Sequence, residues 1–143
     1  MSVAIRVGEG VVFTWLGMVL AISFLEAPLK FQVPGVTLQL GLRIGRVVFV
    51  ALNACELMFA FVLSGVLYSH DTPPTLDLVA GIAVAALLVQ LLLVRPVLNR
   101  RTKSVLELQG QEGPRSRGHH VYVALEVIKV ASLLASGVIL TGL

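Results

Sequence analysis

Several ionisable side chains stand inside long apolar stretches of this sequence, where a charge is costly. Glu26, Glu56 and Glu126 each lie within or at the end of such a stretch, and Lys129 follows Glu126 by three positions. A charged residue at the centre of a membrane-spanning helix costs roughly 2.5–3.5 kcal/mol on insertion scales, so such residues are usually paired or functional. Their chemistry suits the binding of a proton, an ion or a polar solute.

The polar residues of the apolar stretches are not scattered, because they recur at helical spacing. Asn53 and Glu56 share one helix face, and Glu126 and Lys129 share another. We therefore predict one polar pocket, open toward the cytoplasm, whose carboxylates bind a proton or a small polar solute. Its predicted lining comprises Glu26, Lys30, Arg46, Asn53, Glu56, His119, Tyr122, Glu126 and Lys129. On the last helix, His119, Tyr122 and Glu126 would form a ladder for proton entry.

A purely structural role is the alternative interpretation of the same charges. Two of the carboxylates have a lysine three or four positions further along, which suits a local ion pair on a helix. Glu56 has Arg46 and Asn53 on its own face as candidate partners. Such pairs would fix the order of the helices without binding a ligand.

The sequence supports no metal or cofactor assignment. His119 and His120 stand together at the start of a helix, but the Glu-x-x-His repeat of carboxylate metal sites in bundles does not occur. Cys55 is the single cysteine, which excludes an intrachain disulfide and a redox cysteine pair. Nucleotide-binding glycine motifs and a nucleophile elbow are also missing from the sequence.

The elements that must position these residues are four long apolar runs. Hydrophobic residues make up 57% of the 143 residues and charged residues 13%, whereas soluble domains are about 45–50% apolar and about 25% charged. This composition excludes a soluble enzyme, a disordered chain and a disulfide-bonded secreted domain. We predict a single domain over residues 1–143, an all-α integral membrane protein whose four transmembrane helices form a small antiparallel bundle. The predicted helices are 5–27, 42–68, 73–98 and 119–141, with a flexible basic loop over 99–118.

The end of the first helix and the role of the third helix can also be predicted. Pro28 is expected to end the first helix, because the residue before a proline avoids the helical conformation. The following connector contains Pro34 and Gly35, which favour a turn. The third helix carries only Gln90 as a polar residue before Arg95, and we expect it to face lipid or to serve as a packing partner.

The basic residues predict the orientation in the membrane. Nine of the eleven lysines and arginines lie in or beside two connectors, and cytoplasmic loops collect such residues. Both basic connectors should therefore be cytoplasmic and both termini outside, in a multi-pass protein of the cell membrane. The bilayer and, at the basic loop, anionic lipid are the expected partners, and nucleic acid is not needed to explain the positive charge. The nine residues are Lys30, Arg43, Arg46, Arg95, Arg100, Arg101, Lys103, Arg115 and Arg117.

Two pairs of small residues at a spacing of four suit close helix packing, within the chain or in a homo-oligomer. They are Gly41 with Gly45 and Ser132 with Ser136.

Three functional classes remain open from the sequence. The favoured one is a small transporter or ligand-binding membrane protein. The others are a membrane-embedded enzyme acting on a lipid, quinone or tetrapyrrole, and an accessory subunit of a larger membrane complex.

Overall fold

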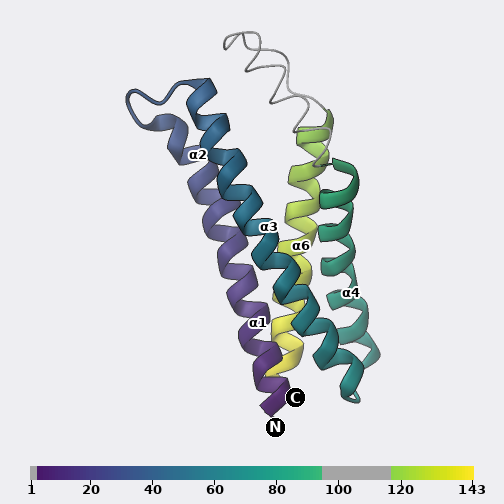
Figure 1. The fold of residues 1–143 in the computed structure, drawn as a ribbon. Coiled ribbons are helices and arrows are strands. Elements are labelled where there is room, and N and C mark those ends of the chain that lie inside the picture. Colours follow the sequence, from purple (N-terminus) through teal and green to yellow (C-terminus); the bar gives the residue numbers. More distant parts are fainter. Residues whose placement is uncertain (1–2, 95–116) are drawn as a thin grey trace.

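The computed structural model describes residues 3–94 and 117–143, and these residues form a helical bundle (Figure 1). Four helical segments are long and apolar enough to cross a membrane: Val3–Gln32, Leu38–Ser69, Pro74–Leu92 and Val121–Thr141. Both termini lie at the same end of the bundle (Figure 1). The predicted all-α, four-helix membrane architecture is confirmed. The predicted end of the third helix at 98, and nearly all of the loop 99–118, lie outside the described residues.

The first span is longer than predicted, because Pro28 does not end it. Helix α1 (Val3–Val19) continues through a π-helical segment (Leu20–Glu26), the short α2 (Ala27–Leu29) and a final 3₁₀ turn (Lys30–Gln32). The backbone N–H of Ala27 bonds to the carbonyl of Ile22, five residues back. A π-type adjustment of this kind accommodates a proline inside a membrane helix, because neighbouring backbone groups find new partners.

The other spans differ less from the prediction. Helix α3 (Leu38–Ser69) begins four residues before the predicted start at 42, because the Thr37 side chain caps it by accepting from the Leu40 N–H at 3.1 Å. The turn ahead of it contains Gly35 at φ 89°, a conformation that glycine adopts readily. Helix α4 (Pro74–Val89) continues as a π-helical segment (Gln90–Val94), and α6 spans Arg117–Thr141.

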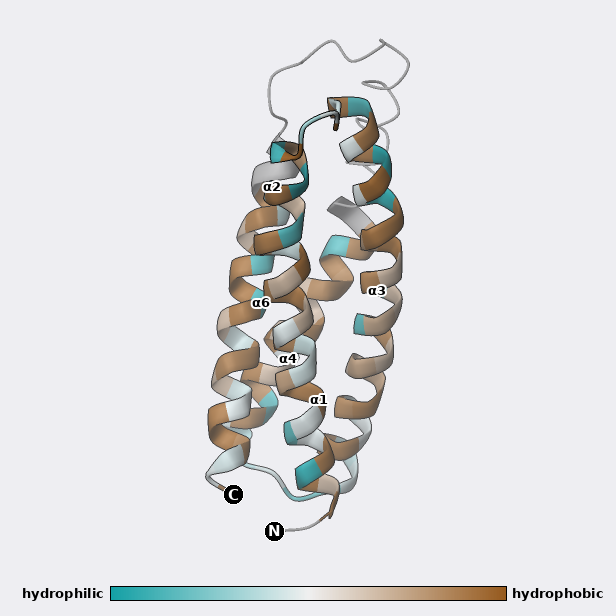
Figure 2. Ribbon diagram, turned by 90° about the vertical axis from the view of Figure 1, so that its left-hand side faces the viewer, coloured by the Kyte–Doolittle hydropathy of each residue, from teal (hydrophilic) through white to brown (hydrophobic). Residues whose placement is uncertain are grey.

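Helix α6 is the centre of the packing. It packs along α4 on one side and along α1 on another, and α1 also packs against α3. Helices α3 and α4 are consecutive in the chain but touch each other little. Hydrophobic residues make up much of all four spans (Figure 2). The buried apolar core comprises Ile5, Val12, Trp15, Leu16, Val19, Ala60, Leu63, Leu76, Ala80, Ala83, Leu87, Leu133 and Leu140.

The two pairs of small residues are used for packing within the chain. The Phe31 ring lies against Gly41, and the Lys30 side chain lies over Gly45, at 2.7 Å from where a Cβ would be. Ser132 and Ser136 are buried and donate to backbone carbonyls four residues back, at 2.7 and 2.8 Å. A homo-oligomer through these faces stays a prediction.

Candidate functional site

Five side chains from all four spans meet in the middle of the bundle and form what we call the central cluster. Trp15 comes from α1, Glu56 from α3, Gln90 from the end of α4, and Glu126 and Lys129 from α6. None of the five is more than 2% exposed. Lys129 lies twelve residues from either end of α6, which is about 18 Å at 1.5 Å per residue.

The ammonium group of Lys129 holds the cluster together. Its Nζ lies 2.5 Å from Glu56 Oε2 and 2.5 Å from Glu126 Oε1. It also donates to Gln90 Oε1 at 2.8 Å. An ammonium group has three protons to donate. The three acceptors come from three different helices, so the hydrogen-bonding capacity of Lys129 is used in full.

In each carboxylate of the cluster, one oxygen has two polar contacts and the other has no described hydrogen-bond partner. Glu56 Oε2 accepts from Trp15 Nε1 at 2.9 Å in addition to Lys129. Glu126 Oε1 accepts from Gln90 Nε2 at 2.7 Å in addition to Lys129. The remaining oxygens, Glu56 Oε1 and Glu126 Oε2, are buried and have no hydrogen-bond partner among residues 3–94 and 117–143.

The charges of the cluster do not balance. Two carboxylates share one ammonium, so the ionised cluster carries one net negative charge in the apolar interior. A buried charge is tolerated when it is paired and hydrogen-bonded. The second carboxylate has no cation of its own within the described part of the chain, where the ion pairs of the cluster are the two that Lys129 makes.

Helices α3 and α6 run in the same direction (Figure 1), and two side-chain pairs join them. The rings of Phe49 and Tyr122 meet edge to face at 6.1 Å between centroids, and Glu56 meets Lys129. Both pairs are separated by 73 positions. At the same offset, Asn53 lies at the level of Glu126, on the side of the cluster nearer to the start of both helices. Asn53 and Tyr122 are each 7% exposed.

The predicted site residues Glu26 and Lys30 form a separate pair. Lys30 Nζ lies 3.8 Å from Glu26 Oε2, and it also faces the Phe31 and Phe49 rings at 5.4 and 6.0 Å from their centroids. Glu26 follows the cluster residue Trp15 by eleven positions, about 16 Å along a helix. The structure therefore joins two of the three carboxylates that were expected to share one pocket.

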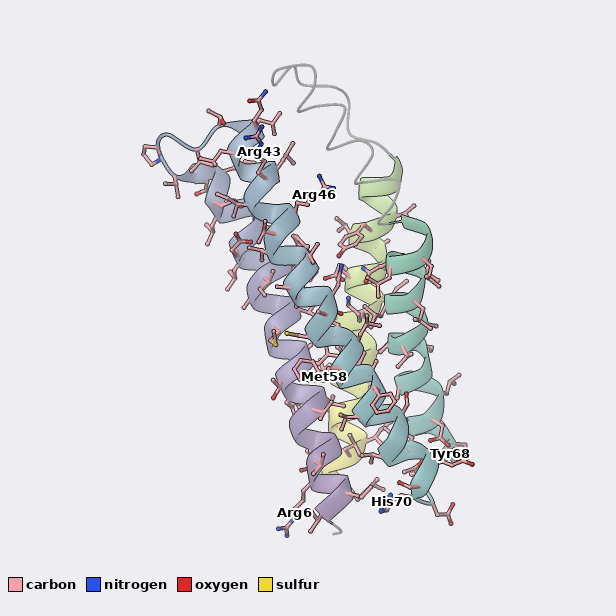
Figure 3. The ribbon with its side chains drawn as sticks, viewed as in Figure 1. Arg6, Arg43, Arg46, Met58, Tyr68 and His70 are labelled. Carbon is pink, nitrogen blue, oxygen red and sulfur yellow. The ribbon has the colours of Figure 1, made fainter. Side chains whose placement is uncertain are left out.

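Arg46 does not pair with Glu56, contrary to one interpretation of the sequence. It lies ten positions earlier on α3, about 15 Å along the helix, and its side chain is exposed. Arg43 and Arg46 lie at the end of the bundle opposite Arg6 (Figure 3). The side chain of His119 lies outside the described residues, and the ladder of His119, Tyr122 and Glu126 stays a prediction.

Sequence reasoning missed two members of the cluster. Gln90 was expected to belong to a helix facing lipid or acting as a packing partner, yet its amide bridges Lys129 and Glu126. Trp15 was given no role in the predicted pocket. A lone amide inside an apolar run, and an indole on a buried face, were the available signals, since both carry polar groups that need partners when buried.

Within residues 3–94 and 117–143, no group of three or more His, Cys, Asp or Glu is arranged to hold a metal ion. The cluster combines two carboxylates with an amide and an ammonium, and its oxygens are the ligand type of hard cations, whereas softer metals prefer nitrogen or sulfur. No protein-family model matches the chain, and no curated protein or solved structure matches it either. The fold and the cluster define the class: a multi-pass helical membrane protein with a buried ionic centre.

Proposed function

We propose that this chain is a small membrane transporter or ligand-binding protein in which the central cluster takes up a proton, coupled to a small polar solute or ion. The observation that carries the proposal is the unequal charge of the cluster, with two buried carboxylates for one ammonium. One bound proton makes the cluster neutral. Ionisable residues inside a membrane span are commonly proton relays or parts of an ion pathway.

A purely structural network would not need the second carboxylate. One carboxylate and the Gln90 amide suffice to accept from the ammonium of Lys129, and such a set is already neutral. Each carboxylate also keeps one buried oxygen without a described partner. The excess charge and the open oxygens thus favour binding over structural stabilisation alone.

The residues on the two sides of the cluster differ in polarity, which favours access of protons to the cluster from one end of the bundle. Tyr122 lies on α6 between the start of that helix and the cluster. Apolar residues such as Leu63, Leu133 and Leu140 are fully buried between the cluster and the end that holds both termini. We propose that protons enter from the end that holds the basic connectors, and that this end is cytoplasmic in the cell membrane, with both termini outside. The basic connector would then lie near anionic lipid.

Infrared difference spectroscopy on the full chain in lipid vesicles tests proton uptake directly. A pH step should produce the carbonyl stretch of a protonated carboxylic acid in the native protein. Glu56→Gln and Glu126→Gln should remove or shift that band. Glu9→Gln is the matched control, because Glu9 lies in the N-terminal half of α1, away from the cluster.

A flux measurement in the same vesicles tests the transport half of the proposal. A pH-sensitive dye inside the vesicles should report proton entry under an imposed membrane potential. Entry should be lost in Glu56→Gln and retained in Glu9→Gln. The proposal would be contradicted if the infrared band and the proton flux were the same in the native protein, Glu56→Gln and Glu9→Gln.

A further inference from the structure

We propose that Asn53, Glu56 and Glu126 form a binding site for a monovalent alkali cation, with Na⁺ as the probe. The inference rests on the proposed function, since it names the ion that the central cluster takes up besides a proton. Its basis is independent of proton binding: three buried oxygens that have no described partner, on residues of α3 and α6 that two cross-helix contacts put at neighbouring levels.

The three oxygens are all acceptors. They are Asn53 Oδ1, Glu56 Oε1 and Glu126 Oε2, and none has a hydrogen-bond partner among the described residues. The side chains that carry them are 7%, 0% and 2% exposed. Buried acceptors in native proteins nearly always have partners. Acceptors cannot satisfy one another, so the arrangement calls for a donor or a cation between them, and the net negative charge of the ionised cluster favours a cation.

Helix geometry puts the three residues at neighbouring levels of the bundle. Asn53 and Glu56 are three residues apart on α3 and therefore adjacent on one face. The 73-position register between α3 and α6 puts Asn53 at the level of Glu126. Both carboxylates are also held by the single ammonium of Lys129 through their other oxygens, which leaves Oε1 of Glu56 and Oε2 of Glu126 for a ligand.

Charge and ligand type select the cation. The ionised cluster has one net negative charge, which one monovalent cation neutralises, whereas a divalent ion would leave one positive charge buried. Carboxylate and amide oxygens are ligands of hard cations, and softer metals prefer nitrogen or sulfur. The site therefore fits an alkali cation that reaches it by losing part of its hydration.

Binding of radioactive Na⁺ to the purified full chain in detergent tests the proposal, with choline chloride keeping the ionic strength constant. The native protein should bind Na⁺ saturably. Asn53→Ala should weaken binding by at least the roughly 10–100-fold that follows loss of a group supporting a metal ligand. Asn53→Asp should tighten binding, because it adds a charge at the same place. Ser64→Ala, an exposed position on α3, is the matched control and should bind like the native protein.

Thermal unfolding with and without Na⁺ is the second measurement, and it applies also to a variant that purifies poorly. Na⁺ should stabilise the native protein and Ser64→Ala, but not Glu126→Gln. Absence of saturable Na⁺ binding, with the infrared carboxylic band intact, would overturn this site and leave the proton function standing. Na⁺ binding that is equal in Asn53→Ala, Asn53→Asp and the native protein would also overturn it. Loss of both the Na⁺ and the infrared signals in the native protein would overturn both proposals.

Discussion

Replacing Lys129 by methionine is the most direct test of how the central cluster is built. The substitution keeps an unbranched side chain that is one atom shorter and removes the ammonium group. It leaves the carboxylates of Glu56 and Glu126 buried at 0% and 2% exposure, without the cation that both contact at 2.5 Å. It also removes the donor to Gln90 Oε1.

The magnitude follows from the burial of the partners. Removing one member of a buried ion pair costs about 3–5 kcal/mol, because the other charge stays buried and unpaired. Lys129 serves two carboxylates, so Lys129→Met should lower the free energy of unfolding by at least about 3–5 kcal/mol. Adding Glu56→Gln should recover part of this loss, since contacting residues couple by roughly 0.5–3 kcal/mol.

Equilibrium unfolding in mixed micelles, with an increasing fraction of a denaturing detergent, measures these differences. Lys30→Met is the matched control, because Lys30 pairs with Glu26 at 3.8 Å and Glu26 is 35% exposed. Partly exposed pairs of this kind contribute about 0–1 kcal/mol. Equal losses for the two lysine variants, or a double variant no more stable than Lys129→Met alone, would refute the reasoning.

Three further predictions test the packing and the orientation. Trp15→Phe removes one hydrogen bond to a buried carboxylate and should cost about 1.5–3 kcal/mol in the same unfolding assay. Leu133→Ala should cost about 2–5 kcal/mol because Leu133 is fully buried, whereas Leu134→Ala, at a position 51% exposed, should change stability little; equal costs would contradict the register of α6. In a variant without the native cysteine, a cysteine at Gln111 should react with a membrane-impermeant reagent only from the cytoplasm, and one at Thr72 only from outside. The reverse labelling would overturn the orientation.

The architecture was predictable because its causes are local in the sequence. Each apolar run is long enough to span a bilayer, and helical spacing correctly placed Asn53 with Glu56, and Glu126 with Lys129, on buried faces of α3 and α6. The end of the first span was not predictable by the same means. Pro28 reads as a stop in isolation, and only the π-helical turn before it, Leu20–Glu26, allows the helix to continue to Gln32.

The candidate site was predictable only where its members share a helix. Glu126 and Lys129 are three positions apart, so their pairing follows from helix geometry alone. The partner of Glu56 depends on which helices meet and at what level, and the sequence suggested Arg46 instead of Lys129. Gln90 joins through the packing of α4 on α6, a contact that no local pattern specifies.

The cluster separates the contacts that hold the helices together from the atoms that remain open to a ligand. Lys129 donates to acceptors on α3, α4 and α6, and Trp15 adds α1 through the same oxygen of Glu56. These contacts engage only one oxygen of each carboxylate. Because the other oxygens take no part in joining the helices, the proposed proton or cation would bind there and leave while the network keeps its connections. We expect the same separation in the variants. Lys129→Met, which removes the ammonium, should mainly lower the free energy of unfolding, whereas Asn53→Ala, which removes the amide, should mainly weaken ion binding.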